Sequence, residues 1–201
     1  MIKLSIIIPI YNGEEFIKRG LDSIPVRDDL EVICIDDGST DSTPEILKNY
    51  TRLPLKILTN DPNMGIGYST AAGMRAATGE YITGMDIDDY YITEIFDRCL
   101  DTINLGEYDI YNFSYLENDG RVRRFDNIAG LPGKWIRRSF TKYVVFSNRR
   151  TLADVYFMRD LRRLKPKECN LDVIYYRYNY PRKGSVSYDI EKGWGVPGHE
   201  E

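Results

Sequence analysis

The stretch Ile-Thr-Gly-Met-Asp-Ile-Asp-Asp, residues 82–89, is the starting point for the fold that this sequence predicts. It combines a short apolar run, Tyr81–Met85, with three carboxylates that follow at once, Asp86, Asp88 and Asp89. The run predicts a buried strand, so the acids lie at its carboxyl end, the edge at which open α/β sheets bind ligands. Carboxylate oxygens are ligands that Mg²⁺ and Mn²⁺ prefer. The stretch therefore indicates either a metal and diphosphate site or a solvated acidic turn.

Strands and helices alternate on the N-terminal side of this stretch. Apolar runs and helical spacings predict strands at residues 4–10, 31–35, 55–58 and 81–85, and helices at residues 14–24, from 42 onward, and 68–77. This order predicts an α/β fold with a mostly parallel sheet and right-handed crossovers. The pattern weakens after residue 90. There we expect a smaller α+β subregion, with helices at 92–105, 140–146 and 153–164, a hairpin around 117–120, and short strands at 173–180 and 185–188.

Composition limits the classes of function. The chain has 27 basic and 31 acidic residues, and its net charge of −4 argues against a nucleic-acid partner. No apolar run approaches the ~20 residues of a membrane span, and no signal-peptide cleavage pattern follows the first run. Three separated cysteines fit reduced thiols, so we expect a cytoplasmic protein. A single histidine, His199, leaves almost no candidate for a mechanism that needs a catalytic histidine.

Basic residues are concentrated in the second half of the chain. They form either solvated helix faces or a surface for an anionic acceptor, a partner or a membrane. The second interpretation predicts peripheral contact with a membrane. The set comprises Arg121, Arg123, Arg124, Lys134, Arg137, Arg138, Lys142, Arg149, Arg150 and the basic residues between Arg159 and Lys167.

A second acidic motif, Ile-Asp-Asp-Gly-Ser-Thr-Asp at residues 35–41, ends the second predicted strand. Gly38 permits a sharp turn there. A carboxylate of Asp36 or Asp37 could accept hydrogen bonds from a nucleobase imide or from ribose hydroxyls. The alternative is a helix-capping turn, which explains the Ser, Thr and Asp but not two adjacent acids before the glycine.

A third motif, Asn63-Met64-Gly65-Ile66-Gly67, opens a predicted helix that is rich in alanine and glycine. It is neither a dinucleotide-binding fingerprint nor a phosphate-binding P-loop, because the third glycine and the Gly-Lys-Ser/Thr sequence are missing. Small residues let the backbone approach either a ligand or a neighbouring strand. The motif therefore leaves close packing of the helix and close approach of a ligand as alternatives.

The three motifs and the opening segment 5–12 occur in the order and spacing of a known family. The chain resembles the family 2 glycosyltransferases, whose nucleotide-sugar-binding domain has the GT-A fold, a Rossmann-like, mostly parallel sheet flanked by helices. The resemblance covers residues 3–105 and continues more weakly to about residue 188. It implies one domain, residues 1–201, with a nucleotide-sugar-binding half (1–105) and an acceptor-binding half (106–201).

The resemblance implies a role for each matching residue of the donor half. Asp88 would bind Mn²⁺ or Mg²⁺, Asp86 would face the ribose or share the ion, and Asp89 would support this turn or cap a helix. The ion would bridge the diphosphate and stabilise the charge on the leaving nucleotide. The nucleotide-sugar site implied by the resemblance comprises Pro9, Tyr11, Asn12, Asp36, Asp37, Asn63, Gly65 and Asp86.

The segment Arg150–Phe157 resembles the part of the family in which Glu-Asp precedes an aromatic-rich helix. Ala153 stands where the family usually has Glu, and Asp154 stands at the position of the catalytic base. The alternative for Asp154 is a helix cap or a surface acid, with Asp160 and Asp172 as weaker substitutes for the base. Trp135 stacks either on a sugar or in the core.

The function that the resemblance implies is inverting transfer of a sugar from a nucleotide-diphosphate sugar, with UDP-sugars favoured, to a saccharide or lipid-linked acceptor. Synthesis of a surface polysaccharide or glycoconjugate is the expected setting. The chain contains no glutamine, which excludes the Gln-x-x-Arg-Trp motif of processive synthases and favours single additions. His199 could add a metal ligand, and Arg182 or Lys183 could approach the diphosphate. The alternatives are a nucleotide-sugar-binding module without catalysis, or a nucleotidyltransferase, against which the acidic segment 11–15 argues.

Overall fold

The computed structural model describes residues 1–103, 105–124, 130–144 and 153–179. Within these ranges one nine-stranded sheet has the strand order β3-β2-β1-β4-β8-β6-β9-β5, with β7 paired to β6. The strands are β1 (Leu4–Ile10), β2 (Leu30–Asp36), β3 (Leu55–Thr59), β4 (Tyr81–Gly84), β5 (Tyr90–Tyr91), β6 (Ile110–Glu117), β7 (Val122–Arg123), β8 (Lys134–Arg137) and β9 (Glu168–Tyr178). The helices are α1 (Ile17–Asp22), α2 (Thr43–Asn49), α3 (Ile66–Ala76), α4 (Thr93–Thr102), α5 (Arg138–Thr141) and α6 (Ala153–Arg162).

The first half of the chain forms the predicted parallel sheet. Strands β3, β2, β1 and β4 are all parallel neighbours. The strand expected at residues 4–10 is found with these bounds, and almost every residue in it is buried, as expected for a parallel strand covered on both faces. The register pairs Ile10 with Asp36 and Ile7 with Gly84. The acidic segments after β2 and β4 therefore meet at one edge of the sheet.

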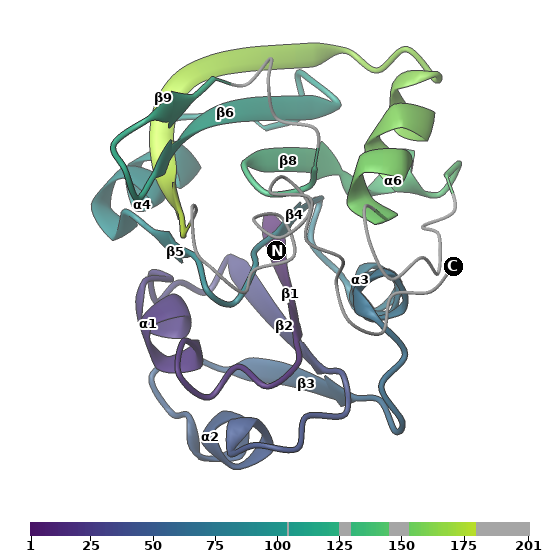
Figure 1. Ribbon diagram of the computed structural model, residues 1–201. Coiled ribbons are helices and arrows are strands. Elements are labelled where there is room, and N and C mark those ends of the chain that lie inside the picture. Colours follow the sequence, from purple (N-terminus) through teal and green to yellow (C-terminus); the bar gives the residue numbers. More distant parts are fainter. Residues whose placement is uncertain (104, 125–129, 145–152, 180–201) are drawn as a thin grey trace.

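Helices cover both faces of this sheet (Figure 1). Ile6 and Ile8 pack with Ile17 and Leu21 of α1 in one core, whereas Ile7 packs with the side of α3 in a second core. A Cβ atom on Gly73 of α3 would come within 2.5 Å of Ile7 Cγ2 and 2.8 Å of Ile35 Cδ1. The small residues at this point serve close packing of α3 on the sheet, one of the two alternatives that the sequence left open.

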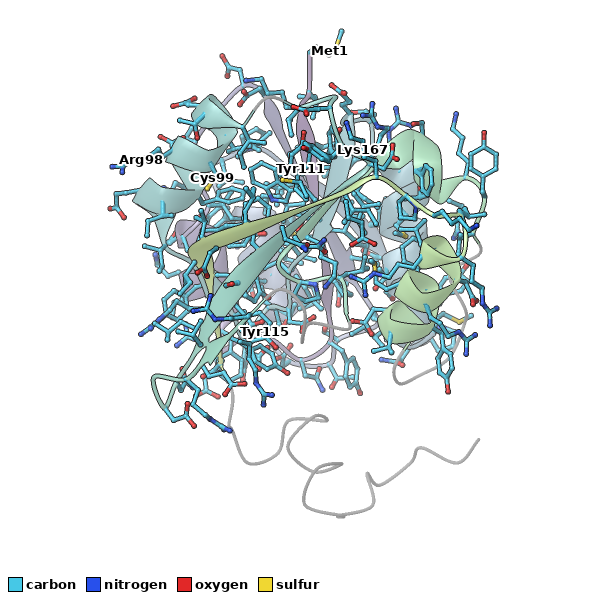
Figure 2. The ribbon with its side chains drawn as sticks, turned by 90° about the horizontal axis from the view of Figure 1, so that it is seen from above. Met1, Arg98, Cys99, Tyr111, Tyr115 and Lys167 are labelled. Carbon is cyan, nitrogen blue, oxygen red and sulfur yellow. The ribbon has the colours of Figure 1, made fainter. Side chains whose placement is uncertain are left out.

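The second half extends the sheet with a different topology. Strand β8 is antiparallel to both β4 and β6, and β9 is parallel to β6. Figure 2 shows β9 lying along β6, with Tyr115 and Lys167 toward opposite ends of the pair. The predicted hairpin at residues 117–120 joins β6 and β7. No helix in the described ranges is long and apolar enough to cross a membrane.

Several element boundaries differ from the prediction; helix α5, for example, spans Arg138–Thr141 where a helix at residues 140–146 is predicted. Strand β9 begins at Glu168 instead of residue 173, because Asn112 of β6 donates hydrogen bonds to Glu168 and Asn170 across the pair. The first helix begins at Ile17 instead of residue 14. Glu14 lies in the loop before α1, where its carboxylate accepts a hydrogen bond from the Ser42 N–H at 2.9 Å. The strand expected at 185–188 lies outside the described residues.

Candidate active site

The loops that follow β1 and β2 are tied together at the carboxyl edge of the sheet. The Asn12 N–H donates to Ser39 Oγ at 2.9 Å, and the Thr40 N–H donates to Asn12 Oδ1 at 2.8 Å. Asn12 has a φ of 51°, a left-handed conformation that asparagine tolerates better than most residues. Tyr11, beside it, is 52% exposed. The two loops thus form one surface, on which Tyr11 presents an accessible ring.

Asp37 organises the loop that leads into α3. Its buried carboxylate accepts hydrogen bonds from Asn60 Nδ2 at 2.7 Å, from the Met64 N–H at 3.0 Å and from the Gly65 N–H at 2.8 Å. Gly65 has a φ of 87°, a conformation that favours glycine. These contacts explain why an acid and a glycine stand at positions 37 and 65. The predicted contact of Asp37 with a nucleobase stays a prediction.

Asp36 and Asp41 complete the turn after β2. Asp36 is buried, and its Oδ1 accepts a hydrogen bond from the Ser39 N–H at 3.0 Å. Asp41 Oδ1 accepts a hydrogen bond from the Thr43 N–H at 3.0 Å, in the first turn of α2. The capping alternative therefore accounts for Asp41. Capping does not account for Asp36 and Asp37. These two acids instead accept hydrogen bonds that shape the loops at the sheet edge.

The acidic turn after β4 gathers like charges. Burial, then the nearby carboxylates of Asp88 and Asp154, raise the pKa of Asp86 to about 7. Asp154 comes from α6, far along the chain, so this electrostatic contact brings the two halves together. A carboxyl group whose pKa is raised by burial and by neighbouring carboxylates is typical of functional sites.

Asp89 is held below this turn by Tyr176 of β9. The Tyr176 hydroxyl donates to the Asp89 carboxylate and accepts a hydrogen bond from the Asp86 N–H at 3.3 Å, while the Asn179 N–H donates to Asp89 Oδ1 at 2.7 Å. Asp89 is buried, and burial together with the charges of Asp86 and Asp88 raises its pKa well above the usual range. Asp89 supports the turn and is not a helix cap, because α4 begins at Thr93.

Replacing Tyr176 with Phe is expected to lower the free energy of unfolding by about 1–3 kcal/mol, because the buried Asp89 carboxylate and the Asp86 N–H each lose a partner. Urea unfolding followed by circular dichroism measures this change. The control is Tyr143→Phe, since Tyr143 is 75% exposed. Equal unfolding midpoints for the two variants would show that the Tyr176 hydroxyl does not support the turn.

Pro9, Asp86 and Asp154 line one pocket, which the parallel sheet, α3 and the start of α6 enclose. Its other lining residues include Ile66, Thr70 and Pro132. Asp154 lies in the first turn of α6, where its carboxylate accepts hydrogen bonds from the Val155 N–H at 2.9 Å and the Leu131 N–H at 3.2 Å. The carboxylate is thereby fixed beside the pocket, which separates it from an ordinary surface acid.

Most of the other predicted site residues do not line this pocket. Asp160 and Asp172 form ion pairs with Arg163 and Arg124, at 3.0 Å and 2.6 Å, and neither lines the pocket. The buried Ala153 lines the pocket beside Asp154, so a methyl group stands where the family usually has a carboxylate. The predicted site residues that do not line the pocket are Tyr11, Asn12, Asp36, Asp37, Asn63, Gly65 and Asp88. Arg182, Lys183 and His199 lie outside the described residues.

Trp135 packs in the core, and its alternative role of stacking on a sugar is wrong. Its side chain is 0% exposed. Its ring lies 4.8 Å from that of Phe113 and 5.8 Å from that of Phe96, measured between centroids. Strand β8 alternates between faces, so Trp135 points into one core while its neighbours Lys134 and Ile136 point toward α6. The signal that could have indicated this is the position of Trp135 inside a buried strand.

Lys134 is buried, which corrects its place in the predicted basic surface. Its side chain is 0% exposed, and Nζ donates to the Gly130 carbonyl at 2.6 Å. Burial, followed by the charge of Arg162, lowers the pKa of Lys134 from 10.5 to about 7. Several other members of the basic set lie within ion-pair distance of carboxylates, including Arg121, Arg123, Arg124, Arg137, Arg162 and Arg163.

The lowered pKa of Lys134 predicts a pH-dependent stability. The unfolded chain keeps this proton up to about pH 10.5, whereas the folded protein releases it above about pH 7. Stability should therefore rise with pH between these values. Relative to Lys134→Met, the wild type is expected to gain on the order of 2–3 kcal/mol between pH 7 and pH 10. Urea unfolding at both pH values measures the gain. A constant difference between the two proteins would contradict the buried, titrating lysine.

The residues of the acidic turn fit a divalent cation that is shared with a ligand. Within the described ranges, no group of three or more His, Cys, Asp or Glu side chains could hold a metal by itself. Asp86 and Asp88 are near enough for the charge of one to raise the pKa of the other, and a cation would relieve this repulsion. Mg²⁺ commonly takes one or two carboxylates and completes its shell with phosphate oxygens and water. The donor set thus suits Mg²⁺ or Mn²⁺ with a diphosphate.

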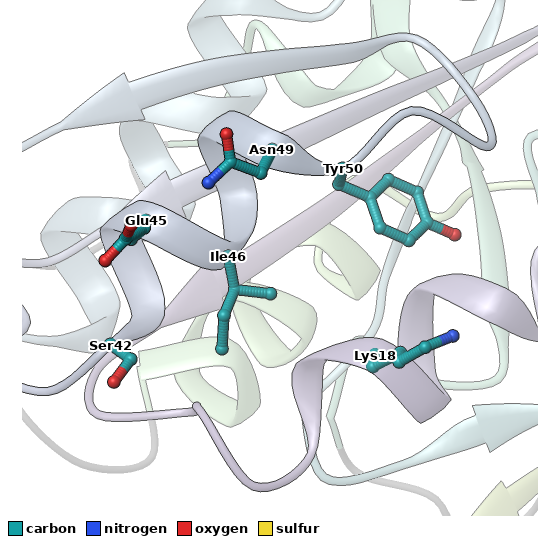
Figure 3. Close-up of a pocket in the computed structure, with 6 residues that line it drawn as sticks. All are labelled: Lys18, Ser42, Glu45, Ile46, Asn49 and Tyr50. Carbon is teal, nitrogen blue, oxygen red and sulfur yellow. The ribbon is translucent and has the colours of Figure 1, made fainter.

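A second hollow lies between α1 and α2, lined by Lys18, Ser42, Glu45, Ile46, Asn49 and Tyr50 (Figure 3). Lys18 pairs there with Asp22, one turn further along α1. This hollow shares no lining residue with the pocket of Asp86 and Asp154. Asp86 and Asp154 therefore lie apart from this hollow.

Known proteins resemble both the sequence and this arrangement. A family model described as glycosyl transferase family 2 matches residues 5–165. The chain belongs to this family. As a family 2 glycosyltransferase it is 33% identical, over 147 residues, to a poly(ribitol-phosphate) beta-glucosyltransferase of Bacillus spizizenii; the alignment covers 70% of this chain and 21% of that protein. It is 30% identical, over 125 residues, to EpsJ of Bacillus subtilis, an uncharacterized glycosyltransferase, covering 61% of this chain and 36% of that protein.

Solved structures confirm the fold of this family 2 member. TarS 1–349 of Staphylococcus aureus, in complex with UDP, matches with a TM-score of 0.77 at 24% identity over 89% of this chain and 60% of that one. A mannosyltransferase of Pyrobaculum calidifontis, in complex with GDP-Man and Mn²⁺, matches with a TM-score of 0.75 at 19% identity over 94% of this chain and 60% of that one. The predicted GT-A fold is thus confirmed. The chain spans between a fifth and about a third of the two curated relatives named above.

Proposed function

We propose that this chain transfers a sugar from a nucleotide-diphosphate sugar to an acceptor hydroxyl with inversion at the anomeric carbon. The observation that carries the proposal is the pocket that Asp86 and Asp154 share at the carboxyl edge of the sheet. One acid belongs to the motif implied to bind the donor, and the other stands at the position of the base. The pocket thus holds the two kinds of group that the reaction needs.

The proposed reaction is a single displacement. Asp154 takes the proton from the acceptor hydroxyl while that oxygen attacks the anomeric carbon, and the bond to the diphosphate breaks on the opposite side. Hydrogen bonds from the Leu131 and Val155 N–H groups hold the carboxylate in place. A Mn²⁺ or Mg²⁺ ion bound by Asp86 and Asp88 would balance the charge on the leaving diphosphate.

The donor side of the proposal rests on the loops at the sheet edge. Tyr11 and Asn12, with the loops that Asp36 and Asp37 organise, would enclose the nucleoside, while Pro9, Asn63 and Gly65 would shape the pocket around it. The solved relatives include TarS complexes with UDP and with UDP-GlcNAc and a mannosyltransferase complex with GDP-Man. These complexes support a nucleotide-sugar donor, and we favour a UDP-sugar.

The acceptor side of the proposal is a saccharide or lipid-linked acceptor, extended by one sugar at a time. Several relatives are named as transferases acting on poly(ribitol-phosphate), which supports a role in surface polysaccharide synthesis. We propose a cytoplasmic location with peripheral contact at the membrane, and no nucleic-acid partner. Sedimentation with anionic liposomes tests the membrane contact, and protein that stays in the supernatant would remove that part of the proposal.

A nucleotide-sugar-binding module without catalysis is the second candidate. Ala153 favours it, because its buried methyl group leaves no carboxylate beside Asp154 at the position where the family usually has Glu. Calorimetry with a panel of UDP- and GDP-sugars, with and without Mn²⁺, tests donor binding. Release of nucleoside diphosphate tests catalysis in the same samples.

The two measurements separate the candidates. Metal-dependent binding together with slow hydrolysis or transfer supports the transferase. Binding with no turnover, for water or for any acceptor, supports the binding module. Absence of binding to every donor, with or without the metal, would contradict both.

A further inference from the structure

We propose that Lys134 is a positioning residue for Asp154, acting through the single peptide group that joins Gly130 and Leu131. The side-chain amine of Lys134 holds the carbonyl end of this peptide, and the N–H end holds the Asp154 carboxylate. The inference relies on the proposed function only in naming Asp154 as the base. Its structural part concerns two side chains and one peptide group and can be measured without turnover.

The hydrogen bonds form a continuous chain from lysine to aspartate. Lys134 Nζ donates to the Gly130 carbonyl at 2.6 Å, and the Leu131 N–H donates to Asp154 Oδ2 at 3.2 Å. The carbonyl of Gly130 and the N–H of Leu131 belong to the same planar peptide. Because a bond at one end of such a group polarises the other end, the lysine both orients the N–H and strengthens its donation to the carboxylate.

Gly130 allows this peptide to lie directly against the carboxylate. A Cβ atom on Gly130 would come within 2.2 Å of Asp154 Oδ2 and 3.2 Å of its Cγ, so any larger residue would displace the aspartate or the loop. The approach fixes the distance between peptide and carboxylate. The hydrogen bond from Lys134 then restricts the rotation of the peptide about its flanking bonds.

The position of Lys134 has a cost in stability that packing alone does not explain. It lies on the face of β8 that also carries Ile136, beneath the apolar residues of α6. The charged groups near it are Arg162, which disfavours the ammonium, and Asp154 and Glu168, which favour it. An apolar residue would fill the same space without removing an ammonium from water. A buried lysine at this point is thus better explained by its link to Asp154.

The decisive experiment compares Lys134→Met with Ile136→Val, a mild core change on the same face of β8. Backbone amide hydrogen exchange of Leu131, measured by NMR, reports the peptide directly. We expect exchange at Leu131 to accelerate at least about tenfold in Lys134→Met relative to the amides of Trp135 and Ile136. In Ile136→Val all three amides should change together. Lys134→Leu, which likewise removes the side-chain N–H, serves if the methionine variant does not fold.

Kinetics and binding separate positioning from general structural damage. In Lys134→Met we expect kcat to fall about 10–100-fold, as for other residues that orient a functional side chain, with the affinity for UDP or GDP in Mn²⁺ changed less than about twofold. In the Asp154→Asn background the Lys134→Met change should lower the residual rate no further.

Two outcomes would overturn the inference. Leu131 exchange and kcat that match those of Ile136→Val would reduce Lys134 to a packing residue. If Lys134→Met lowers kcat, nucleotide affinity and stability together, Lys134 is likewise only a packing residue. If the wild type turns over no donor, the proposed function fails, and exchange at Leu131 still decides whether Lys134 orients the peptide that binds Asp154.

Discussion

Replacing Asp154 with Asn is expected to lower kcat for sugar transfer by about 10²–10⁴-fold, the usual contribution of a general base. The amide keeps the size of the side chain, and its single oxygen can still accept one of the two hydrogen bonds that the Leu131 and Val155 N–H groups donate to the two carboxylate oxygens. It cannot accept a proton from the acceptor hydroxyl. Donor affinity should stay within about twofold of the wild type, because the lost function belongs to the chemical step.

Asp160→Asn is the matched control for this variant. Asp160 lies on the same helix, is paired with Arg163 at 3.0 Å, and does not line the pocket. Its substitution should leave both kcat and donor affinity unchanged, since partly exposed ion pairs contribute little. Rates of nucleoside diphosphate release, with acceptor or with water, provide the measurement. Full turnover by Asp154→Asn would show that another group takes the proton.

Replacing Asp88 with Asn is expected to weaken Mn²⁺-dependent donor binding at least about tenfold, a loss of more than ~1.4 kcal/mol. A neutral amide oxygen is a poorer ligand than a carboxylate, so the site would hold the ion, and with it the diphosphate, more weakly. Binding measured in EDTA should be equally weak for the wild type and the variant. Calorimetric titration of a UDP-sugar, with Mn²⁺ and with EDTA, supplies the four affinities.

The control for Asp88→Asn is Asp172→Asn. Asp172 is an exposed acid in an ion pair with Arg124 at 2.6 Å, and it lies in β9, outside the pocket. Its loss should leave the effect of Mn²⁺ on donor affinity intact. If Mn²⁺ raises the donor affinity of Asp88→Asn as much as that of the wild type, residues other than Asp88 hold the ion.

The first half of the fold could be predicted because its strands are continuous apolar runs between helices of clear period. Residues 4–10 were expected as a strand and are one. The start of β9 could not be predicted in this way, since Glu168 and Asn170 are polar. They are held in the sheet by hydrogen bonds from Asn112, more than 50 residues away. The pattern of residues in a short stretch of sequence does not predict hydrogen bonds to residues so far away in the chain.

In the candidate site, too, some residues could be predicted from local motifs and others could not. The acids of residues 86–89 could be placed at the sheet edge because each belongs to a recognisable motif after a strand. The supporting residues could not, because Tyr176 meets Asp89 across 87 positions of sequence. The sequence places Lys134 among the surface basic residues, because a single lysine gives no local sign of burial. Residues that bind a ligand often stand in motifs, whereas residues that hold them in place are defined by the fold.

The proposed reaction is cleavage of a nucleotide sugar in this pocket by a single displacement that depends on a divalent cation. The anomeric configuration of the first product tests it most directly, and water can serve as the acceptor. An α-linked UDP-sugar is incubated with the protein and Mn²⁺, and the anomeric proton of the released sugar is followed by NMR before mutarotation. The β-anomer appearing first, and no release in EDTA, is the predicted result. The α-anomer appearing first would contradict the account.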